Sequence, residues 1–253
     1  MFHFGHISMS YDQIKSLLVT DHPMIEEFKL VFVEETKLET ARQFELQIIL
    51  KPGVHFLQQR DLHGYKLVDP IWKTTIGQEK IGMGLRTIFF EGYDLVAQNS
   101  RFFPNQEYND LGIGSALYVS MERLYRAWGI NKCRLHAVAV GRYAWARQGF
   151  DFLESGVASS MNKPFVDFIT SNGGTLTIPM QHAWNFANFD IGWNDQSGYK
   201  IGKHFMLNHF NAWYGIKYLN DKRMSKIAEN SRREVFAKLP AKIDGAHSDL
   251  AVR

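Results

Sequence analysis

A turn with two glycines, residues 109–114 (NDLGIG), has the clearest chemical potential in this sequence. It follows an apolar run at 95–103 that is typical of a strand. It precedes a stretch, 115–128, whose apolar residues repeat with the period of a helix. The first amides of a helix lack intrahelical partners and lie at its positive end, and glycine lets an anion approach closely or takes a positive φ. The pattern therefore predicts a phosphate-binding turn.

Spacing excludes two common phosphate-binding motifs. A dinucleotide fingerprint needs a further glycine where Leu117 stands. A P-loop needs Gly-Lys-Ser/Thr, and the nearest approach, residues 198–204 (GYKIGKH), ends in His204. A phosphate-binding role for this turn would therefore belong to a family other than these two.

The turn resembles the acyl-CoA-binding motif, Gln/Arg-x-x-Gly-x-Gly/Ala, of the GNAT superfamily of acyltransferases. Downstream, 132–139 (KCRLHAVA) has the pattern of a strand, and 143–150 (YAWARQGF) is similar to the family's helix that ends in Gly-Phe. Both occur in the family's order. The resemblance implies an α/β (α+β) GNAT-like fold with a mixed sheet, and transfer of an acyl group from a pantetheine thioester to a primary amine by direct attack.

The resemblance also implies a donor site at the turn. The donor is acyl-CoA, or acyl-pantetheine on an acidic carrier protein, and no metal is expected. The strand end before Pro104 is expected to receive the pantetheine amides, because proline cannot donate to a ladder. Residues expected at the donor site are Phe102, Phe103, Asn109, Leu111, Gly112, Ile113, Gly114 and Ser115.

Acyl transfer to an amine also needs a base. The candidates are Glu91, His136 and Glu107. His136 alternates with Leu135 and Ala137 in a predicted strand, so it faces away from them. An imidazole has an ordinary pKa near ~6.5, which suits a base, although a strand histidine is often structural.

The departing thiol needs a proton donor. The family's usual tyrosine precedes Gly-Phe by four residues, and Trp145 occupies that position. An indole N–H is not a usable acid, so Tyr143 becomes the candidate acid. A half-buried packing tyrosine is the alternative interpretation of Tyr143.

Two further departures bear on the donor. Asn109 stands where Gln or Arg is usual, and Asp110 places a negative charge beside the predicted diphosphate. A single phosphate on a carrier protein would tolerate that charge better than the three phosphates of CoA. The region 217–238 is rich in Lys and Arg, and it is either a solvated helix face or a docking surface for an acidic partner.

The predicted elements position these residues in one α/β domain over 1–152. Strands are expected at 28–34, 43–50, 85–90, 95–103 and 132–139, and helices at 10–19, 115–128 and 142–148. Residues 153–253 form a long extension with a helix at 162–171 that has Pro164 in its first turn. The extension is expected to pack on the domain or to form an acceptor or acyl pocket. The candidate pocket residues are Trp145, Trp184, Phe186, Phe189 and Trp213.

Composition and charge limit the possible partners and the cellular compartment. The net charge of +3 is too small to imply nucleic-acid binding, and no apolar run approaches the ~18 residues of a membrane span. The single Cys133, in a predicted strand, permits no internal disulfide and favours a reducing cytoplasm. The histidines show no metal-ligand spacing.

Three functions remain open. The first is N-acyl transfer to a small-molecule or peptide amine. The second is fatty acylation of a Lys or ornithine side chain in a peptide natural product. The third is a GNAT-fold binding module without catalysis, and a homodimer is compatible with each.

Overall fold

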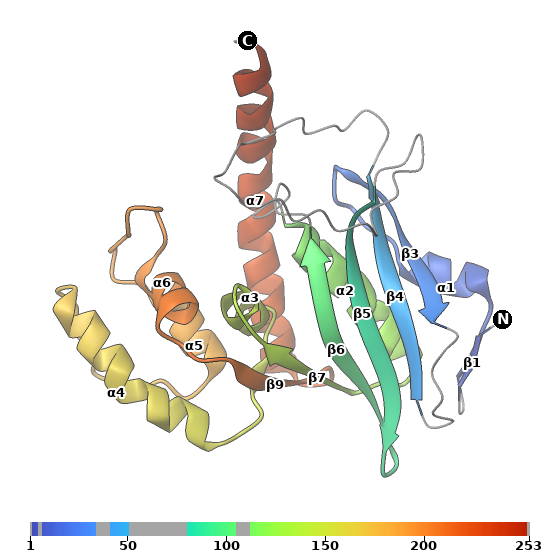
Figure 1. Ribbon diagram of the computed structural model, residues 1–253, viewed down its shortest axis with the longest axis horizontal. Helices are drawn as coiled ribbons and strands as arrows, with labels where there is room; N and C mark the ends of the chain where they lie inside the picture. The colour runs from blue at the N-terminus through green and yellow to red at the C-terminus, as the bar shows by residue number, and fades with distance from the viewer. Residues whose placement is uncertain (1, 5–6, 34–40, 51–79, 105–111, 252–253) are drawn as a thin grey trace, which may run out of the picture. The chain divides into compact units, whose positions relative to one another are not determined.

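The computed structural model describes residues 2–4, 7–33, 41–50, 80–104 and 112–251 (Figure 1). They form two compact units that are interleaved along the chain. The first unit spans residues up to Phe90, then Asn99–Gly129 and the chain from Val235 onward. The second comprises Glu91–Gln98 and Ile130–Glu234. Helices and strands are mixed along the sequence, which confirms the predicted α/β class.

Long strands form the sheet of the first unit. They are hydrogen-bonded in the order β3 (Ile25–Val33), β4 (Ala41–Leu50), β5 (Lys80–Glu91) and β6 (Asp94–Pro104). The β3–β4 and β4–β5 pairs are antiparallel. Phe44, Leu46 and Ile48 alternate along β4 with no exposed area, because successive side chains of a strand point to opposite faces. These side chains form much of the core of this unit.

A hairpin and a short helix precede this sheet. The hairpin pairs β1 (Phe2–Phe4) with β2 (Ile7–Met9), and helix α1 (Tyr11–Leu17) follows it. A capping box starts α1: Ser10 Oγ accepts from Gln13 N at 3.1 Å, and Gln13 Oε1 accepts from Ser10 N at 2.7 Å.

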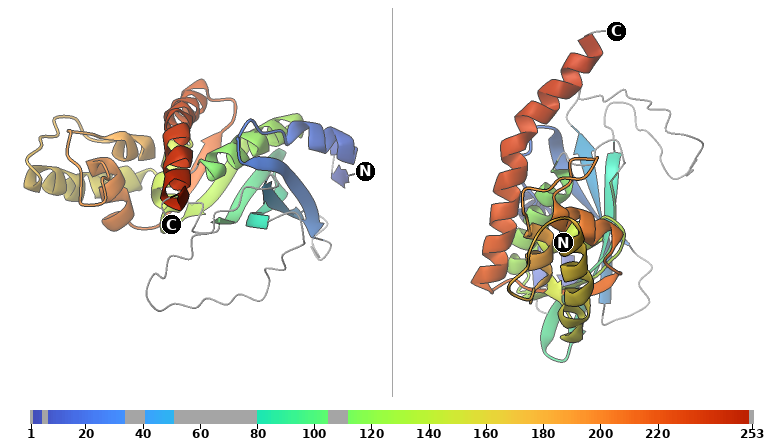
Figure 2. Two further views of the ribbon diagram at one scale, coloured as in Figure 1. Left: turned by 90° about the horizontal axis from the view of Figure 1, so that it is seen from above. Right: turned by 90° about the vertical axis from the view of Figure 1, so that its left-hand side faces the viewer.

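Helix α2 (Ile113–Ala127) lies along one face of the strands of the first unit (Figures 1 and 2). Its buried stripe includes Leu117, Met121 and Leu124, the positions that the helical period predicts. Just beyond it, Trp128 meets Phe44 edge to face at 5.6 Å. The helix therefore faces the sheet with its apolar side.

The second unit continues from the opening residues of β6 through β7 (Lys132–Ala137) and β9 (Trp213–Tyr218) to β8 (Asp151–Phe152). Strand β9 pairs antiparallel with both β7 and β8. It comes from the region predicted to be an extension, so that region supplies a strand as well as helices. Cys133 on β7 is fully buried, as expected for a structural cysteine.

Helices of the second unit enclose an aromatic core. Figure 2 shows α4, α5 and α6 grouped together. Phe165 of α4 lies 5.1 Å from Phe186 of α5 and 4.7 Å from Phe205 of α6 between ring centroids, and all three are fully buried. The helices of this unit are α3 (Gly141–Arg147), α4 (Gly156–Ser171), α5 (Ala183–Asn188) and α6 (Ile201–Asn208).

Helix α4 corrects one prediction. It begins at Gly156 and not near residue 162, so Pro164 lies inside the helix and not in its first turn. Pro164 is exposed, and the helix continues past it to Ser171 because Phe165 and Ile169 are anchored in the core. Core burial here outweighs the backbone bond that proline cannot make.

Helix α7 (Lys222–Ala251) ends the described chain. Asp221 Oδ1 accepts from Arg223 N at 2.7 Å and from Met224 N at 3.1 Å, which caps the N-terminus of the helix. Met224, Ala228 and Ser231 are buried along one side. Residues of α7 up to Glu234 belong to the second unit, and those from Val235 onward belong to the first.

Candidate functional site

The glycine turn of the first unit begins helix α2 without a side-chain cap. Gly112 is the N-cap, with φ 77° and ψ 2°, and as a glycine it supplies no side-chain cap. The first helical bond runs from Ala116 N to Gly112 O at 3.0 Å, so the amides of Ile113 and Gly114 precede the helical ladder. These amides are suited to bind an anion.

The two glycines of the turn have different roles. Gly112 takes the positive φ expected of a turn glycine, but Gly114 is the second residue of α2 and has no positive φ. A Cβ on Gly112 would lie 2.8 Å from Val235 Cγ1 of α7 and 3.9 Å from His22 Nε2. The space that the missing side chain of Gly112 leaves is therefore filled by Val235. Gly114, which is half-buried, is then the glycine that lies next to the first backbone amides of α2.

Several expected donor residues cannot be placed. Asn109 and Leu111 lie outside the described residues, as does Glu107. Phe102 and Phe103 belong to β6, but their side chains are outside the described part. Of the residues expected at a donor site, Gly112, Ile113, Gly114 and Ser115 are those that the structure describes in full.

His136 lies on the outward face of the second unit. It is exposed on β7, whereas Leu135 and Ala137 are buried, as the alternation predicted. Its ring stacks on Tyr214 of β9, with centroids 4.5 Å apart and planes 16° from parallel. Tyr214 was not a sequence candidate, since its pairing partner on β7 is 78 residues away and only the sheet register brings them together.

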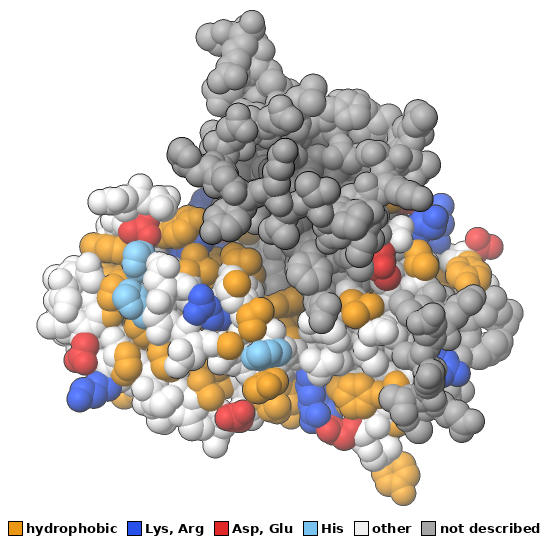
Figure 3. Space-filling view, in the orientation of Figure 1, with side chains coloured by type: hydrophobic (Ala, Val, Ile, Leu, Met, Phe, Trp, Pro, Cys, Tyr) orange, Lys and Arg blue, Asp and Glu red, His pale blue; other side chains and the backbone are white. Residues whose placement is uncertain are grey.

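Hydrophobic side chains gather around histidines on the face shown in Figure 3. Large exposed apolar residues of the second unit include Val138, Val140 and Leu153, at 51, 61 and 42% exposure. Leu153 N donates to Tyr214 O at 2.8 Å, so Leu153 is held beside the strand that carries Tyr214. Between the two valines, Ala139 has a φ of 46°, an uncommon conformation for a residue with a Cβ.

Glu91 is committed to ion pairs. Its carboxylate accepts from Lys132 Nζ at 2.7 Å and pairs with Arg134 through both oxygens, at 2.6 and 2.8 Å. The hydrogen bond from Lys132 and then that from Arg134 lower the pKa of Glu91. A lowered pKa makes a weaker base, so this geometry favours His136 over Glu91 for proton abstraction.

Tyr143 lies on α3 among cations. Its ring is 5.5 Å from Lys203 Nζ and 6.0 Å from the guanidinium carbon of Arg147. Trp145, five residues before Phe150 in the chain, is half-buried on α3 and packs edge to face on Phe150 at 5.3 Å.

The predicted pocket residues of the extension pack against other aromatic rings of the second unit. Trp184, Phe186 and Trp213 are 4, 0 and 3% exposed. Trp213 meets Phe152 at 5.2 Å, and Phe189 meets Phe165 at 5.3 Å, both edge to face. Their contacts are those of a core, and an acyl-binding role for them stays a prediction.

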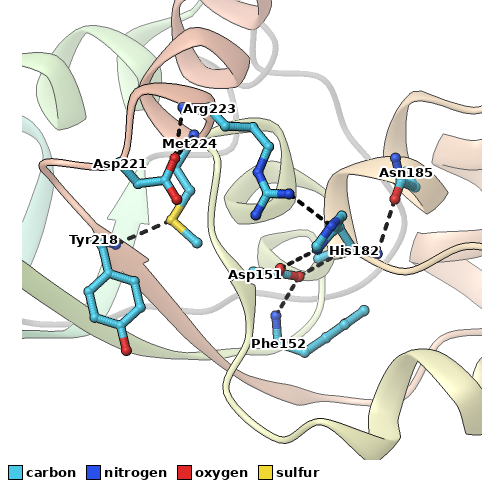
Figure 4. A network of polar contacts seen from close by, with 9 residues as sticks. Asp151, Phe152, His182, Asn185, Tyr218, Asp221, Arg223 and Met224 are labelled. Atoms are coloured by element: carbon cyan, nitrogen blue, oxygen red, sulfur yellow. Dashed lines mark hydrogen bonds and ion pairs between the residues drawn. The ribbon is translucent and has the colours of Figure 1, made fainter.

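A polar network joins three segments of the second unit (Figure 4). His182 Nδ1 is 2.6 Å from Asp151 Oδ2, and the other carboxylate oxygen accepts from Phe152 N and Ala183 N. His182 Nε2 is 3.2 Å from a guanidinium nitrogen of Arg223. Asp151 and His182 are 31 residues apart, so sequence spacing gave no signal for this network.

A second Asp–His pair lies beside α6. Asp195 Oδ2 is 2.5 Å from His204 Nδ1, and Asp195 Oδ1 accepts from Ser197 N and Tyr199 N. The hydrogen bond to His204 is the main cause that lowers the pKa of Asp195. This contact ties the 195–199 turn to α6.

Metal and membrane sites were also considered. Among the described residues, no group of three or more His, Cys, Asp or Glu side chains could hold a metal ion. No helix of the described part has the length and apolarity needed to cross a bilayer.

The chain was compared with known proteins. No model of a known protein family matches the sequence, and the search of curated proteins finds no match.

Proposed function

We propose that this protein is an acyltransferase that moves an acyl group from a pantetheine thioester to a primary amine. The observation that carries the proposal is the start of α2, where a strand, a positive-φ glycine and an uncapped helix end follow one another. The same residues resemble the GNAT motif, which suggests that the anion bound here is a phosphate of the acyl donor, either CoA or phosphopantetheine.

The order of elements supports the proposal. After α2, strand β7 carries His136, and α3 leads to Gly149 and Phe150, the Gly-Phe pair of the resemblance. Gly149 has a φ of 80°, and a Cβ there would lie 2.2 Å from Met224 O. Only glycine fits that position, so packing within this fold explains why residue 149 is a glycine.

The proposed reaction uses the side chains in simple roles. His136 takes a proton from the acceptor ammonium, and the amine lone pair attacks the thioester carbonyl. The C–N bond forms, the attacking nitrogen loses its second proton to water, the C–S bond breaks, and the thiolate receives a proton from Tyr143 or from water. Amides at the start of α2 would hold the donor phosphate and take no part in bond breaking.

Three observations favour a binding module instead. Glu91 is engaged by two cations, and Trp145 replaces the family's usual acid. Val235 also lies against Gly112, so a donor phosphate would have to approach from the side of Gly114. A module of this kind would bind a pantetheine thioester without turning it over.

The test separates these functions. We expect calorimetry to show binding of octanoyl-CoA, and a thiol-reactive dye to show thiol release when an amine is added. His136→Ala should slow release while donor affinity stays unchanged. Binding without thiol release from any amine in a broad panel would establish the module, and no donor binding at all would refute the phosphate turn.

A further inference from the structure

Arg223 lies at the surface against side chains that carry no carboxylate. Its guanidinium approaches His182 Nε2 at 3.2 Å and lies over the ring of Trp184 at 5.3 Å. Two other arginines of the second unit pair with carboxylates, Arg147 with Glu234 and Arg134 with Glu91. Arg223 makes no ion pair with a described residue, and it is exposed.

The groups that hold Arg223 are themselves fixed. Asp151, whose side chain is 15% exposed, bonds to His182 Nδ1, and the ring of His182 stacks on Trp184 at 4.5 Å. The proton of His182 therefore faces Asp151, and Nε2 is an acceptor for Arg223. Figure 4 shows this order from Asp151 through His182 to Arg223. A charged fork with a fixed position binds an external anion at a lower entropic cost than a free side chain.

Two more cations share this end of α7. Lys222 and Lys226 are exposed, and neither makes an ion pair with a described residue. At ~100° per residue, they lie on the side of the helix opposite the buried Met224, Ala228 and Ser231. Lys222, Arg223 and Lys226 are called the basic surface below. Arg233 is left out because Glu229 compensates it at 2.5 Å.

Two acids close to the basic surface make hydrogen bonds within the fold. Asp221 caps α7 through Arg223 N and Met224 N, and Asp151 serves His182 and two backbone amides. Three cations therefore face solvent with their neighbouring carboxylates engaged in the fold. Such a surface attracts an acidic partner and increases its rate of association.

We propose that the basic surface docks an acidic acyl carrier protein, which presents the acyl group on its phosphopantetheine arm. The inference rests on the proposed acyltransferase function and names its donor. Two features favour a carrier protein over free acyl-CoA. The basic surface offers charge complementarity to a protein, and Asp110, beside the glycine turn in sequence, disfavours the three phosphates of CoA more than one.

The experiment uses the full chain and a purified holo-acyl carrier protein of a bacterial fatty acid synthase, labelled for fluorescence anisotropy. The double variant K222E/K226E should weaken carrier-protein binding about 10- to 100-fold, because it replaces two attractive pairs by two repulsive ones. R223Q should weaken it about two- to fivefold. The matched control, K29E/K163E, has the same net charge and alters two exposed lysines of β3 and α4. It should bind the carrier protein like the wild type.

Binding of octanoyl-CoA, measured in parallel by calorimetry, should be unchanged in all variants. Equal carrier-protein affinity of wild type and K222E/K226E would overturn the proposal, as would a wild type that binds octanoyl-CoA but no carrier protein. Equal weakening by K29E/K163E would show attraction by net charge alone and would also overturn it. If binding is sensitive to K222E/K226E but no amine accepts an acyl group from either donor, the docking surface stands and the acyltransferase function fails.

Discussion

Replacing the two glycines of the turn one at a time separates the fold from the proposed function. Gly114 is the second residue of α2 and lacks a positive φ, so alanine fits its backbone. Alanine is favoured over glycine in helices by up to ~1 kcal/mol. Gly114→Ala should therefore leave the stability unchanged or raise it by up to about 1 kcal/mol, which is ~2–4 °C in melting temperature for a chain of this size.

Gly112→Ala should have the opposite effect on stability. Its φ of 77° costs a residue with a Cβ roughly 1–2 kcal/mol. The new Cβ would also lie 2.8 Å from Val235 Cγ1, so the side chain of Val235 or one of the two helices must shift. We expect a total loss of about 2–4 kcal/mol, measured by urea unfolding.

Donor binding gives the functional half of the comparison. A side chain at position 114 would stand beside the first amides of α2, and a lost hydrogen bond to a charged phosphate costs ~1.5–3 kcal/mol. Gly114→Val should therefore bind octanoyl-CoA at least about tenfold more weakly in calorimetry, with stability retained. A Gly114→Val protein with wild-type affinity would refute the phosphate-turn interpretation. A Gly112→Ala protein as stable as the wild type would refute the account of Val235.

Three further predictions concern the second unit. His136→Ala should lower kcat by about 10²–10⁴-fold with unchanged donor affinity, and an unchanged kcat would remove His136 as the base. Phe186→Ala should destabilise the protein by about 3–5 kcal/mol, because the ring is fully buried, and acetyl and octanoyl donors should then be affected equally if the cluster is only a core. Burial and then the charge of His204 lower the pKa of His209 below its ordinary 6.5. The unfolded chain therefore binds a proton more readily, so stability should fall as pH drops below 6.5, and urea unfolding of His209→Gln should show a smaller fall.

Local patterns predicted much of the fold. The apolar runs at 28–34, 43–50, 85–90, 95–103 and 132–139 all correspond to strands, because each has a buried face and β-forming residues. Helix α2 followed from its apolar stripe and from Gly129, whose φ of 74° ends it. These signals lie within one element, so the sequence displays them directly.

Signals between distant segments were not available from the sequence. Strand β9 is buried at four of its six positions, and these positions lie on both faces of the strand. Its sequence therefore lacks the alternation of a half-exposed strand, and the sequence showed only an accumulation of aromatic residues there. The Asp151–His182 and Asp195–His204 pairs depend on loops whose course no residue pattern gives. The start of α4 was misjudged because Pro164 resembles a first-turn proline, although eight residues of helix precede it.

Gly112 shows why a glycine motif alone does not establish a binding site. The sequence offers one explanation for this glycine, close approach of a phosphate, and the structure supplies another, close approach of Val235. Both need a missing Cβ and a positive φ, so conservation of Gly112 in a variant library would not distinguish them. Gly114 does distinguish them, because its φ is not positive and its backbone angle does not demand glycine there. The functional content of the turn therefore rests on Gly114, and a protein that tolerates valine at this position without loss of donor binding uses the turn for folding alone.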